Sequence, residues 1–375
     1  MLKLFAVFVA AVILAYISER HTKLVLASGR NYSVRKDWAY IALIVILTLF
    51  AGLRTQYNDT WNYIRGFNNA VGVHEWLSDP ENLNPFRNPL FYFFQSLLKS
   101  VFGNAQILIF LSSLVTQCCF IRFFKRYSEH FVFSIFLYFT LGTLVFSLAA
   151  LKQVLSMAVV TLAVPLLEEK KWIQYLVVIL FAMLIHTYSI VFILLPLCRA
   201  RPWKSFTFIF LGIIALILLN FREVITAFLD QANELGKTIA EYEVFDNNTI
   251  NLLRLAVYAV TPIMCFVLQR WIFVENSKID NVLAHMSIIS FAFMCLGTQS
   301  GANMFARMAM YFELGTICYL PKILKKAFSK ESCRYISLIA VVCFVGFFLY
   351  ANCINMNFGD QYRSMSFFDF VLSIL

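Results

Sequence analysis

The stretch WAYIALIVILTLFAGLRTQYNDTWNYIRGF, residues 38–67, joins an apolar run to a segment rich in ionisable and aromatic side chains. Its first half, residues 38–53, contains no charged residue, and such a run favours a helix that crosses a membrane. The second half places Arg54, Asp59 and Arg65 shortly after that helix. The stretch therefore indicates a membrane protein with charged groups at the end of a transmembrane helix.

The composition supports this assignment. Of the 375 residues, 61% are hydrophobic and only 14% are charged, whereas a soluble domain has about 25% charged residues. The long continuous apolar runs exclude the alternating pattern of a β-barrel. We therefore predict an all-α polytopic membrane protein that forms a single helical domain over residues 1–375. About 12 transmembrane helices are expected, at residues 3–18, 38–53, 104–124, 131–148, 151–168, 172–186, 187–199, 205–220, 252–270, 282–298, 304–320 and 334–350.

The positive charges predict the orientation of these helices. The net charge is +10, and most Lys and Arg residues lie in short loops between apolar runs. Such loops face the cytoplasm, so membrane topology explains the charge better than nucleic-acid binding does. The basic loops are residues 18–38, 122–130, 168–172, 199–204, 269–278 and 321–334. The loops 54–103 and 221–251, and both ends of the chain, are then expected to face outward.

Residues 88–104 are predicted to form an interfacial or re-entrant helix on the outer side rather than a span. A crossing here would move the basic loop 122–130 to the outside. The segment also carries Gln95, Ser96 and Lys99 among large aromatic residues, as amphipathic interfacial helices do. The nine cysteines of the chain show neither metal-ligand spacing nor a disulfide framework, so neither a metal nor a cofactor is expected.

Ionisable side chains near the ends of spans are the residues most indicative of function in a membrane protein. Distant segments are expected to bring cations or a titratable histidine to the outer boundary, namely Arg54, Lys152, His186, Arg254 and Arg307. Together they predict an electropositive pocket, with Glu313 as a buried partner for a cation. The same residues also have structural interpretations, such as cations in the lipid headgroups or Asp59 as a helix cap. The rest of loop 54–103 contributes Glu75, Asp79, Glu81 and Arg87.

A cluster of cations at the membrane boundary matches the chemistry of a lipid diphosphate. Arginine binds phosphate in a bidentate manner, and lysine supplies a compact charge. A leaving diphosphate gains negative charge as its bond to a sugar breaks, so fixed cations stabilise the transition state most. A carboxylate such as Asp59 can then take the proton of the attacking hydroxyl. Tyr57, Trp61 and Tyr63 offer aromatic faces for sugar rings.

At these residues the chain resembles the EpsG-like, Wzy-type polysaccharide polymerases of bacterial envelopes. The pieces that carry the resemblance are GLRTQYNDTWNY, NPLFYFFQSLLKSVFGNAQ, LKQVLSMAVVTLAV, KKWIQYLVVILFAMLIHTYSIVFILLPL and ARMAMYFELG, in this order between residues 38 and 320, and the closing YRSMSFFDF. Members of the family more usually have an arginine at the position of Lys152 and a glycine at the position of Asn58.

The resemblance implies a polymerase in the bacterial cytoplasmic membrane, with its active site on the outer side. It would transfer a growing glycan from a polyprenyl diphosphate to a sugar hydroxyl of the next carrier-linked unit. The expected partners are that lipid-linked glycan, the bilayer, and a chain-length regulator and flippase of the same pathway. The implied catalytic residues are Asp59, Arg54 and Arg307, and the implied substrate-binding residues are Lys152, Gln153, His186, Arg254, Tyr57, Trp61 and Tyr63.

Other functions stay open on the sequence. A flippase or transporter for the same lipid-linked sugars would also need an electropositive cavity, although no internal repeat of the kind that transporters show is present. A ligase would differ from a polymerase only in its acceptor. An acyltransferase would have to rely on His186 without a recognisable partner motif. A scaffold without chemistry would leave the cluster of outer cations unexplained.

Overall fold

A computed structural model describes residues 1–28, 33–221, 223–224, 248–274, 276–355 and 357–374. Most of the predicted outer loop 221–251 therefore lies outside the described residues. The chain divides into two compact units, which are treated separately below. Unit 1 comprises Met1–Ala163, Val177–Ser189 and Glu331–Leu375, and unit 2 comprises Val164–Leu176 and Ile190–Lys330. The sequence predicted one helical domain and contained no sign of this division.

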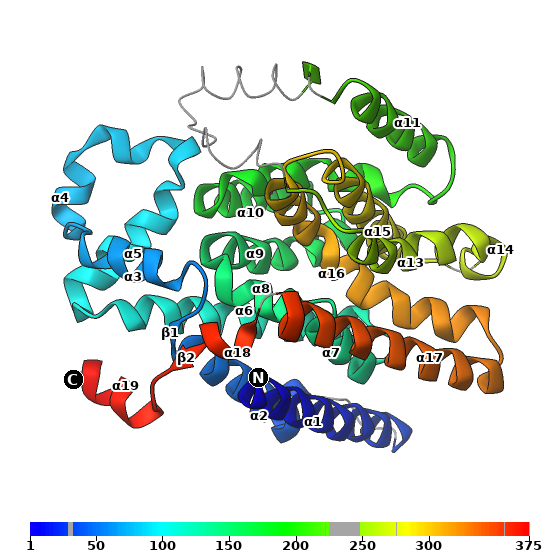
Figure 1. Cartoon of the computed structure of the whole chain (residues 1–375), viewed down its shortest axis with the longest axis horizontal. Helices are drawn as coiled ribbons and strands as arrows, with labels where there is room; N and C mark the ends of the chain where they lie inside the picture. The colour runs from blue at the N-terminus through cyan, green and yellow to red at the C-terminus, as the bar shows by residue number, and fades with distance from the viewer. Residues whose placement is uncertain (29–32, 222, 225–247, 275, 356, 375) are drawn as a thin grey trace. The chain divides into compact units, whose positions relative to one another are not determined.

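Unit 1 is built almost entirely from helices, which can be followed by their labels in Figure 1. Its first part contains α1 (Leu2–Ala27), η1 (Val34–Lys36), α2 (Trp38–Gly52), β1 (Arg54–Gln56), α3 (Thr60–Asn68), α4 (Val73–Ser78), η2 (Pro80–Leu83), η3 (Pro85–Arg87), α5 (Pro89–Phe102), α6 (Ala105–Tyr127), α7 (Phe131–Thr140) and α8 (Thr143–Ala149). Its last part contains α17 (Lys330–Leu349), η5 (Tyr350–Asn355), α18 (Phe358–Gln361), β2 (Arg363–Ser364) and α19 (Phe367–Ile374).

Unit 2 is also helical. The helices α9 (Leu151–Glu168) and α10 (Trp172–Ile185) are shared, because each has residues in both units. The helix η4 (Thr187–Arg199) begins in unit 1 and continues as a 3₁₀ helix in unit 2. The remaining described helices of unit 2 are α11 (Ser205–Leu219), α13 (Leu252–Val267), α14 (Gln269–Ile272), α15 (Lys278–Leu296) and α16 (Ala302–Ala327).

Short polar side chains start several of these helices. Asp37 accepts a hydrogen bond from the backbone N–H of Tyr40 at the start of α2, and Asn104 accepts one from Gln106 at the start of α6. In unit 2, Ser277 and Asp280 form a reciprocal capping box at the start of α15. These caps satisfy backbone donors that the first helical turn leaves without a partner.

Glycines with positive φ end or bend other helices. Gly103 has φ +66° and separates α5 from α6. Gly142 has φ +84° and lies between α7 and α8, which are bent by 52° with respect to each other. Glycine adopts this left-handed backbone with the least strain, because it has no Cβ. The predicted span 131–148 therefore consists of two helices with a bend between them.

Every predicted span overlaps a helix of the structure, so the all-α prediction is confirmed. Among the described residues, five helices are long and apolar enough to cross a membrane, or six if the bent pair α7 and α8 is one span. These helices are α1, α6, α9, α15 and the continuous segment Lys330–Asn355. Helices α2, α10, η4, α11 and α13 are apolar but shorter. The predicted number of about twelve spans is therefore not confirmed.

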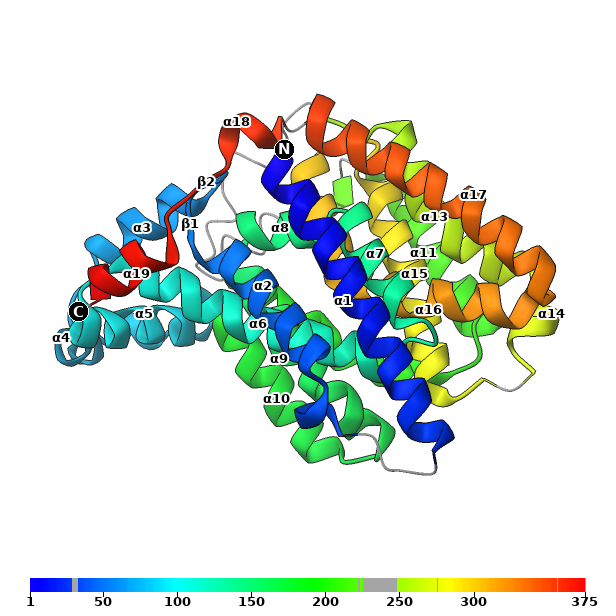
Figure 2. The same cartoon turned by 90° about the horizontal axis from the view of Figure 1, so that it is seen from below.

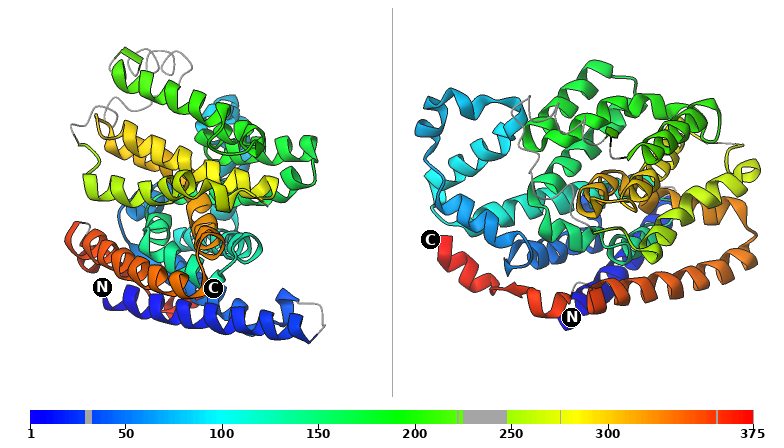
Figure 3. Two further views of the ribbon diagram at one scale, coloured as in Figure 1. Left: turned by 90° about the vertical axis from the view of Figure 1, so that its right-hand side faces the viewer. Right: turned by 45° about the horizontal axis from the view of Figure 1, so that its top comes forward.

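Aromatic packing joins the ends of the chain within unit 1. Phe8 of α1 lies 4.9 Å from Phe139 of α7 and 5.4 Å from Phe348 of α17, measured between ring centroids. Figures 2 and 3 show α1 and α17 as the two long helices nearest the N-terminus, in blue and orange. Burial of such rings contributes strongly to the stability of a helical core.

The strands β1 and β2 form an antiparallel pair in unit 1, although more than 300 residues separate them in the chain. The pair is reinforced by a hydrogen bond from Met365 N to Leu53 O of 3.0 Å and one from the Tyr362 hydroxyl to Phe50 O of 2.6 Å. Burial raises the pKa of Tyr362 to about 12, so the hydroxyl stays protonated and able to donate. Figure 2 shows β2 beside β1 at the end of α2. This pairing positions the loop that follows α2.

Candidate functional site

Arg54 occupies a fully enclosed position in unit 1, with no exposed surface. Its Nε donates to Thr60 Oγ1 at 3.2 Å, and its Nη1 donates to Ser113 Oγ at 3.1 Å and to the Ala51 carbonyl. Burial lowers the pKa of Arg54 to about 10, so the guanidinium remains charged at neutral pH. Its hydrogen bonds hold the end of α2, the start of α3 and the middle of α6 together. All the hydrogen-bond partners that the structure gives Arg54 are groups of the protein itself. The predicted contact of Arg54 with a diphosphate stays a prediction.

The turn between β1 and α3 contains a residue with left-handed backbone. Asn58 has φ +42°, a left-handed conformation that glycine and asparagine adopt most easily. The glycine that the resemblance led us to expect here would suit the same backbone. Asp59 follows at the N-cap position of α3, where its backbone carbonyl accepts a hydrogen bond from Asn62 N at 2.9 Å.

The aromatic residues around this turn have different environments. Tyr57 is buried, with its ring 5.0 Å from the ring of Phe358. Trp61 is 64% exposed on α3, whereas Tyr63 is half-buried with its ring 6.2 Å from Phe91. Tyr57 therefore acts as a packing residue in this structure, and Trp61 and Tyr63 are the accessible aromatic faces of the three.

Lys152, at the start of α9, lies against two aromatic rings of α5. Its Nζ donates to the Tyr92 hydroxyl at 3.1 Å. The same Nζ lies 5.0 Å from the centroid of the Tyr92 ring and 5.7 Å from that of Phe91, within the range of cation–π attraction. The Tyr63 ring also contacts the Phe91 ring, so the structure brings two predicted site residues, Lys152 and Tyr63, to one aromatic side chain.

His186 is placed close to the start of α5. The next residue, Thr187, donates from Oγ1 to the Phe86 carbonyl at 3.0 Å and from its backbone N to Asn88 Oδ1 at 3.0 Å. The His186 ring lies 5.3 Å from that of Tyr188. The first turn of α5 thus contacts both the segment that carries His186 and, through Tyr92, Lys152. Gln153 is a buried side chain of α9.

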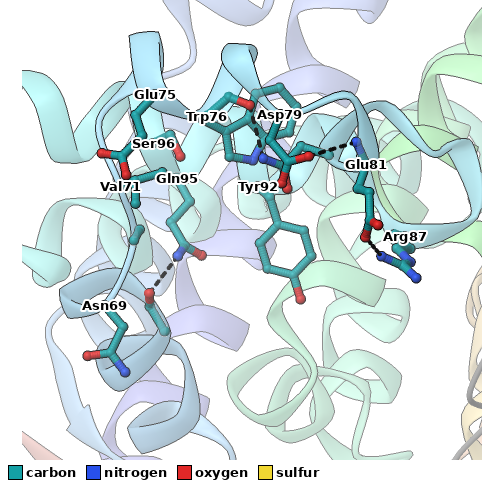
Figure 4. A pocket seen from close by; sticks show the side chains of 13 residues that line it. Asn69, Val71, Glu75, Trp76, Asp79, Glu81, Arg87, Tyr92, Gln95 and Ser96 are labelled. Atoms are coloured by element: carbon teal, nitrogen blue, oxygen red, sulfur yellow. Dashed lines mark hydrogen bonds and ion pairs between the residues drawn. The ribbon is translucent and has the colours of Figure 1, made fainter.

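A cavity of about 540 Å³ lies within unit 1, between α3, α4 and α5 (Figure 4). Its polar lining includes three carboxylates and one guanidinium. Glu81 accepts a hydrogen bond from Arg87 Nη1 at 2.9 Å, and Asp79 accepts one from the backbone N–H of Glu81 at 3.0 Å. The full lining is Gly66, Asn69, Ala70, Val71, Glu75, Trp76, Asp79, Glu81, Asn82, Arg87, Tyr92, Gln95 and Ser96.

None of the ten predicted site residues lines this cavity, but Tyr92 belongs to its wall and accepts the hydrogen bond of Lys152. The sequence prediction stressed cations and missed Trp76, Tyr92 and Ser96. The carboxylates of loop 54–103 were recognisable as ionisable groups, and they occur with tryptophan and amide side chains between residues 66 and 96. This combination of carboxylates, tryptophan and amides is the feature of the sequence from which a polar binding cavity could have been predicted.

The predicted residues of unit 2 have their own surroundings. Arg254 lies in the first turn of α13, with its guanidinium carbon 6.0 Å from the Tyr258 ring. Glu313 of α16 is completely buried, accepts a hydrogen bond from Ser290 Oγ at 3.0 Å, and lies close enough to Arg254 to interact electrostatically. Its predicted role as a buried partner for a cation stays a prediction, since the hydrogen bond that the structure gives it comes from a neutral serine. Arg307 lies in the second turn of α16 and is partly buried.

Comparison with known proteins gives one match, to a protein family. No curated protein and no solved structure matches the chain. The model of the EpsG family matches residues 37–367, which include β1, the turn at Asn58, the cavity, Lys152 and the pairing strand β2. Such a family assignment connects the chain with a polymerase of polysaccharide biosynthesis. The match covers most of the 375 residues, and the chain belongs to the EpsG family.

Proposed function

We propose that this protein polymerises glycans carried on a polyprenyl diphosphate at the outer face of the bacterial cytoplasmic membrane. It transfers the glycan from one lipid carrier to a sugar hydroxyl of the next carrier-linked unit. The observation that carries the proposal is the family match over residues 37–367, and the apolar helices support it by supplying a route to lipid-linked substrates.

The proposed reaction exchanges one C–O bond for another. The bond between the anomeric carbon and the diphosphate oxygen breaks, and the acceptor hydroxyl oxygen forms the new bond to that carbon. The Asp59 carboxylate takes the hydroxyl proton, and the diphosphate leaves with the bonding electron pair. A cation beside the leaving oxygen stabilises the charge that develops on it.

Lys152 is the residue of unit 1 best suited to this cationic role. Its Nζ is held by the Tyr92 hydroxyl and by two aromatic rings, so it is oriented before a substrate arrives. Arg54 instead has a positioning role, because its hydrogen bonds fix the segment that carries Asp59. The diphosphate role of Arg307 and the substrate-binding roles of Arg254 and His186 are proposed from the sequence alone.

Deletion of the gene in its host, followed by mass spectrometry of the lipid-linked sugars, tests the proposal. A polymerase predicts that single repeat units accumulate on the carrier and that long glycan disappears. Carrier lipids of unchanged composition would overturn it. Purified protein in vesicles with carrier-linked repeat units then separates the transport alternative. Lengthened glycan supports the polymerase, whereas lipid that is moved across the bilayer without elongation contradicts it.

A further inference from the structure

The cavity between α3, α4 and α5 has the composition of a sugar-binding site rather than of a phosphate-binding site. Its volume of about 540 Å³ lies within the range of about 300–1,000 Å³ typical of small-molecule pockets. Glu81 is paired with Arg87 at 2.9 Å, while Glu75 and Asp79 add two further carboxylates to the lining. This net negative lining repels phosphate and favours neutral or cationic ligands.

Two buried polar side chains of α5 have hydrogen-bonding capacity directed to this cavity. Ser96 is only 1% exposed, and its hydroxyl has no hydrogen bond within the described part of the chain. Gln95 is 5% exposed and donates from Nε2 to the Gly66 carbonyl at 2.8 Å, as Figure 4 shows. Its Oε1 has no recorded partner among the residues that the structure describes. Neither oxygen is among the fully enclosed unpartnered atoms of the described residues, and both residues line the cavity, so the two oxygens are available to hydrogen-bond a ligand there.

Aromatic and amide groups complete the lining. Trp76 is 6% exposed and is held by an edge contact with Phe93 at 5.6 Å between ring centroids. Asn82 is fixed by its hydrogen bond to the Trp76 carbonyl at 2.9 Å. Sugars present hydroxyls that donate to carboxylates and amide oxygens, and an apolar ring face that packs on aromatic residues.

We propose that this cavity binds an uncharged or amino sugar. The binding groups are the hydroxyl of Ser96, the amide of Gln95, the ring of Trp76 and the carboxylates of the lining, Glu75, Asp79 and Glu81. If the proposed polymerase function holds, on which this part of the inference rests, the bound sugar belongs to the lipid-linked glycan. The cavity then receives sugar and not diphosphate. The Tyr92 side chain connects it with Lys152, because Tyr92 lines the cavity and accepts the Lys152 hydrogen bond.

A substitution that fills the cavity without disturbing the helix provides the test. Gly66 lies in α3 and lines the cavity, and within the described chain a Cβ added there would meet only Gln95 Nε2, at 3.9 Å. The Gly66→Leu side chain would therefore enter the cavity, while leucine favours a helix more than glycine does. Gly346→Leu is the matched control, because a Cβ at this exposed position of α17 meets no described atom within 4 Å.

The assay is saturation-transfer difference NMR on the full-length purified protein in detergent. The probes are glucose, galactose, N-acetylglucosamine, glucosamine and glucuronic acid. We expect at least one uncharged or amino sugar to bind about fivefold more tightly than glucuronic acid, given the repulsion between like charges. Gly66→Leu should abolish this binding and Gly346→Leu should retain it. Ser96→Ala should weaken binding about threefold to tenfold, the contribution of one hydrogen bond.

Three results would overturn the inference: no sugar binds, glucuronic acid binds as well as the neutral sugars, or Gly66→Leu binds like the unmodified protein. The assay needs no lipid donor and no polymerisation, so its outcome is separate from that of the gene deletion. Accumulated repeat units without sugar binding would leave the polymerase in place and remove the sugar site. Sugar binding without accumulated repeat units would retain the sugar site and remove the polymerase.

Discussion

Substitution of Arg54 by alanine separates a structural role of this arginine from direct contact with substrate. The guanidinium makes three hydrogen bonds, to Thr60, Ser113 and the Ala51 carbonyl. Hydrogen bonds from a charged donor contribute about 1.5–3 kcal/mol each. The fall of the Arg54 pKa from its ordinary value of 12.5 to about 10 corresponds to a desolvation penalty of about 3 kcal/mol, which the substitution removes. The net expected loss of stability is about 2–5 kcal/mol.

The measurement is thermal unfolding of the purified protein in detergent, followed by intrinsic fluorescence. Arg54→Ala should lower the Tm by about 3–6 °C. Arg65→Ala, at an exposed position of α3, is the matched control and should leave the Tm within about 1 °C. If Arg54→Ala kept its Tm within that margin but produced no polymer, the arginine would act on substrate and the structural explanation would be wrong.

The pH dependence of this difference follows from the lowered pKa. Because the folded pKa is below the unfolded value, the unfolded chain binds more protons only between about pH 10 and 12.5. In that range the stability contributed by Arg54 rises with pH. Below about pH 10 the guanidinium is protonated in both states. The stability difference between Arg54→Ala and the unmodified protein should therefore not change through titration of Arg54 between about pH 6 and 9.

Substitutions at Lys152, Asp59 and Asn58 provide three further tests. Lys152→Met should reduce the amount of polymer about 100-fold, because it removes a cation from the reaction, whereas Lys152→Arg should retain polymer. The control is Lys99→Met, which alters another lysine above a phenylalanine ring and should have little effect on glycan length measured by gel electrophoresis. Asp59→Asn should bind the carrier-linked unit but not elongate it, as measured by lipid co-purification and glycan length, and lost binding would instead assign Asp59 a structural role. Asn58→Val should destabilise the protein by about 1–2 kcal/mol because of the left-handed backbone, whereas Asn58→Gly should stay within about 1 kcal/mol, both in thermal unfolding, and equal effects would contradict the importance of this turn.

The sequence was sufficient to predict the helices because each apolar run has a physical reason to be helical in lipid. Segment 151–168 was predicted with the bounds of α9. The bend at Gly142 was not predicted, because the residues on both sides are equally apolar and only the backbone conformation reveals the break. The 3₁₀ geometry of residues 187–199 was missed for the same reason.

The site was less predictable than the fold. Composition alone could not distinguish a buried structural arginine from an exposed functional one, and Arg54 proved to be enclosed. The contact of Lys152 with Tyr92 depends on α5 and α9 meeting in space, which no local pattern encodes. The pairing of β1 with β2 involves strands of only three and two residues, too short for a periodic pattern to appear.

The same strand pair has a consequence for how the protein is made. Residues 54–56 leave the ribosome about 300 residues before their partners 363–364. During this interval β1 has no partner strand, so the pair can form only late in synthesis. The strand pair that holds the segment before Asp59 can therefore form only when synthesis is nearly complete, and a chain truncated before residue 362 would keep most of its helices but lack this pair.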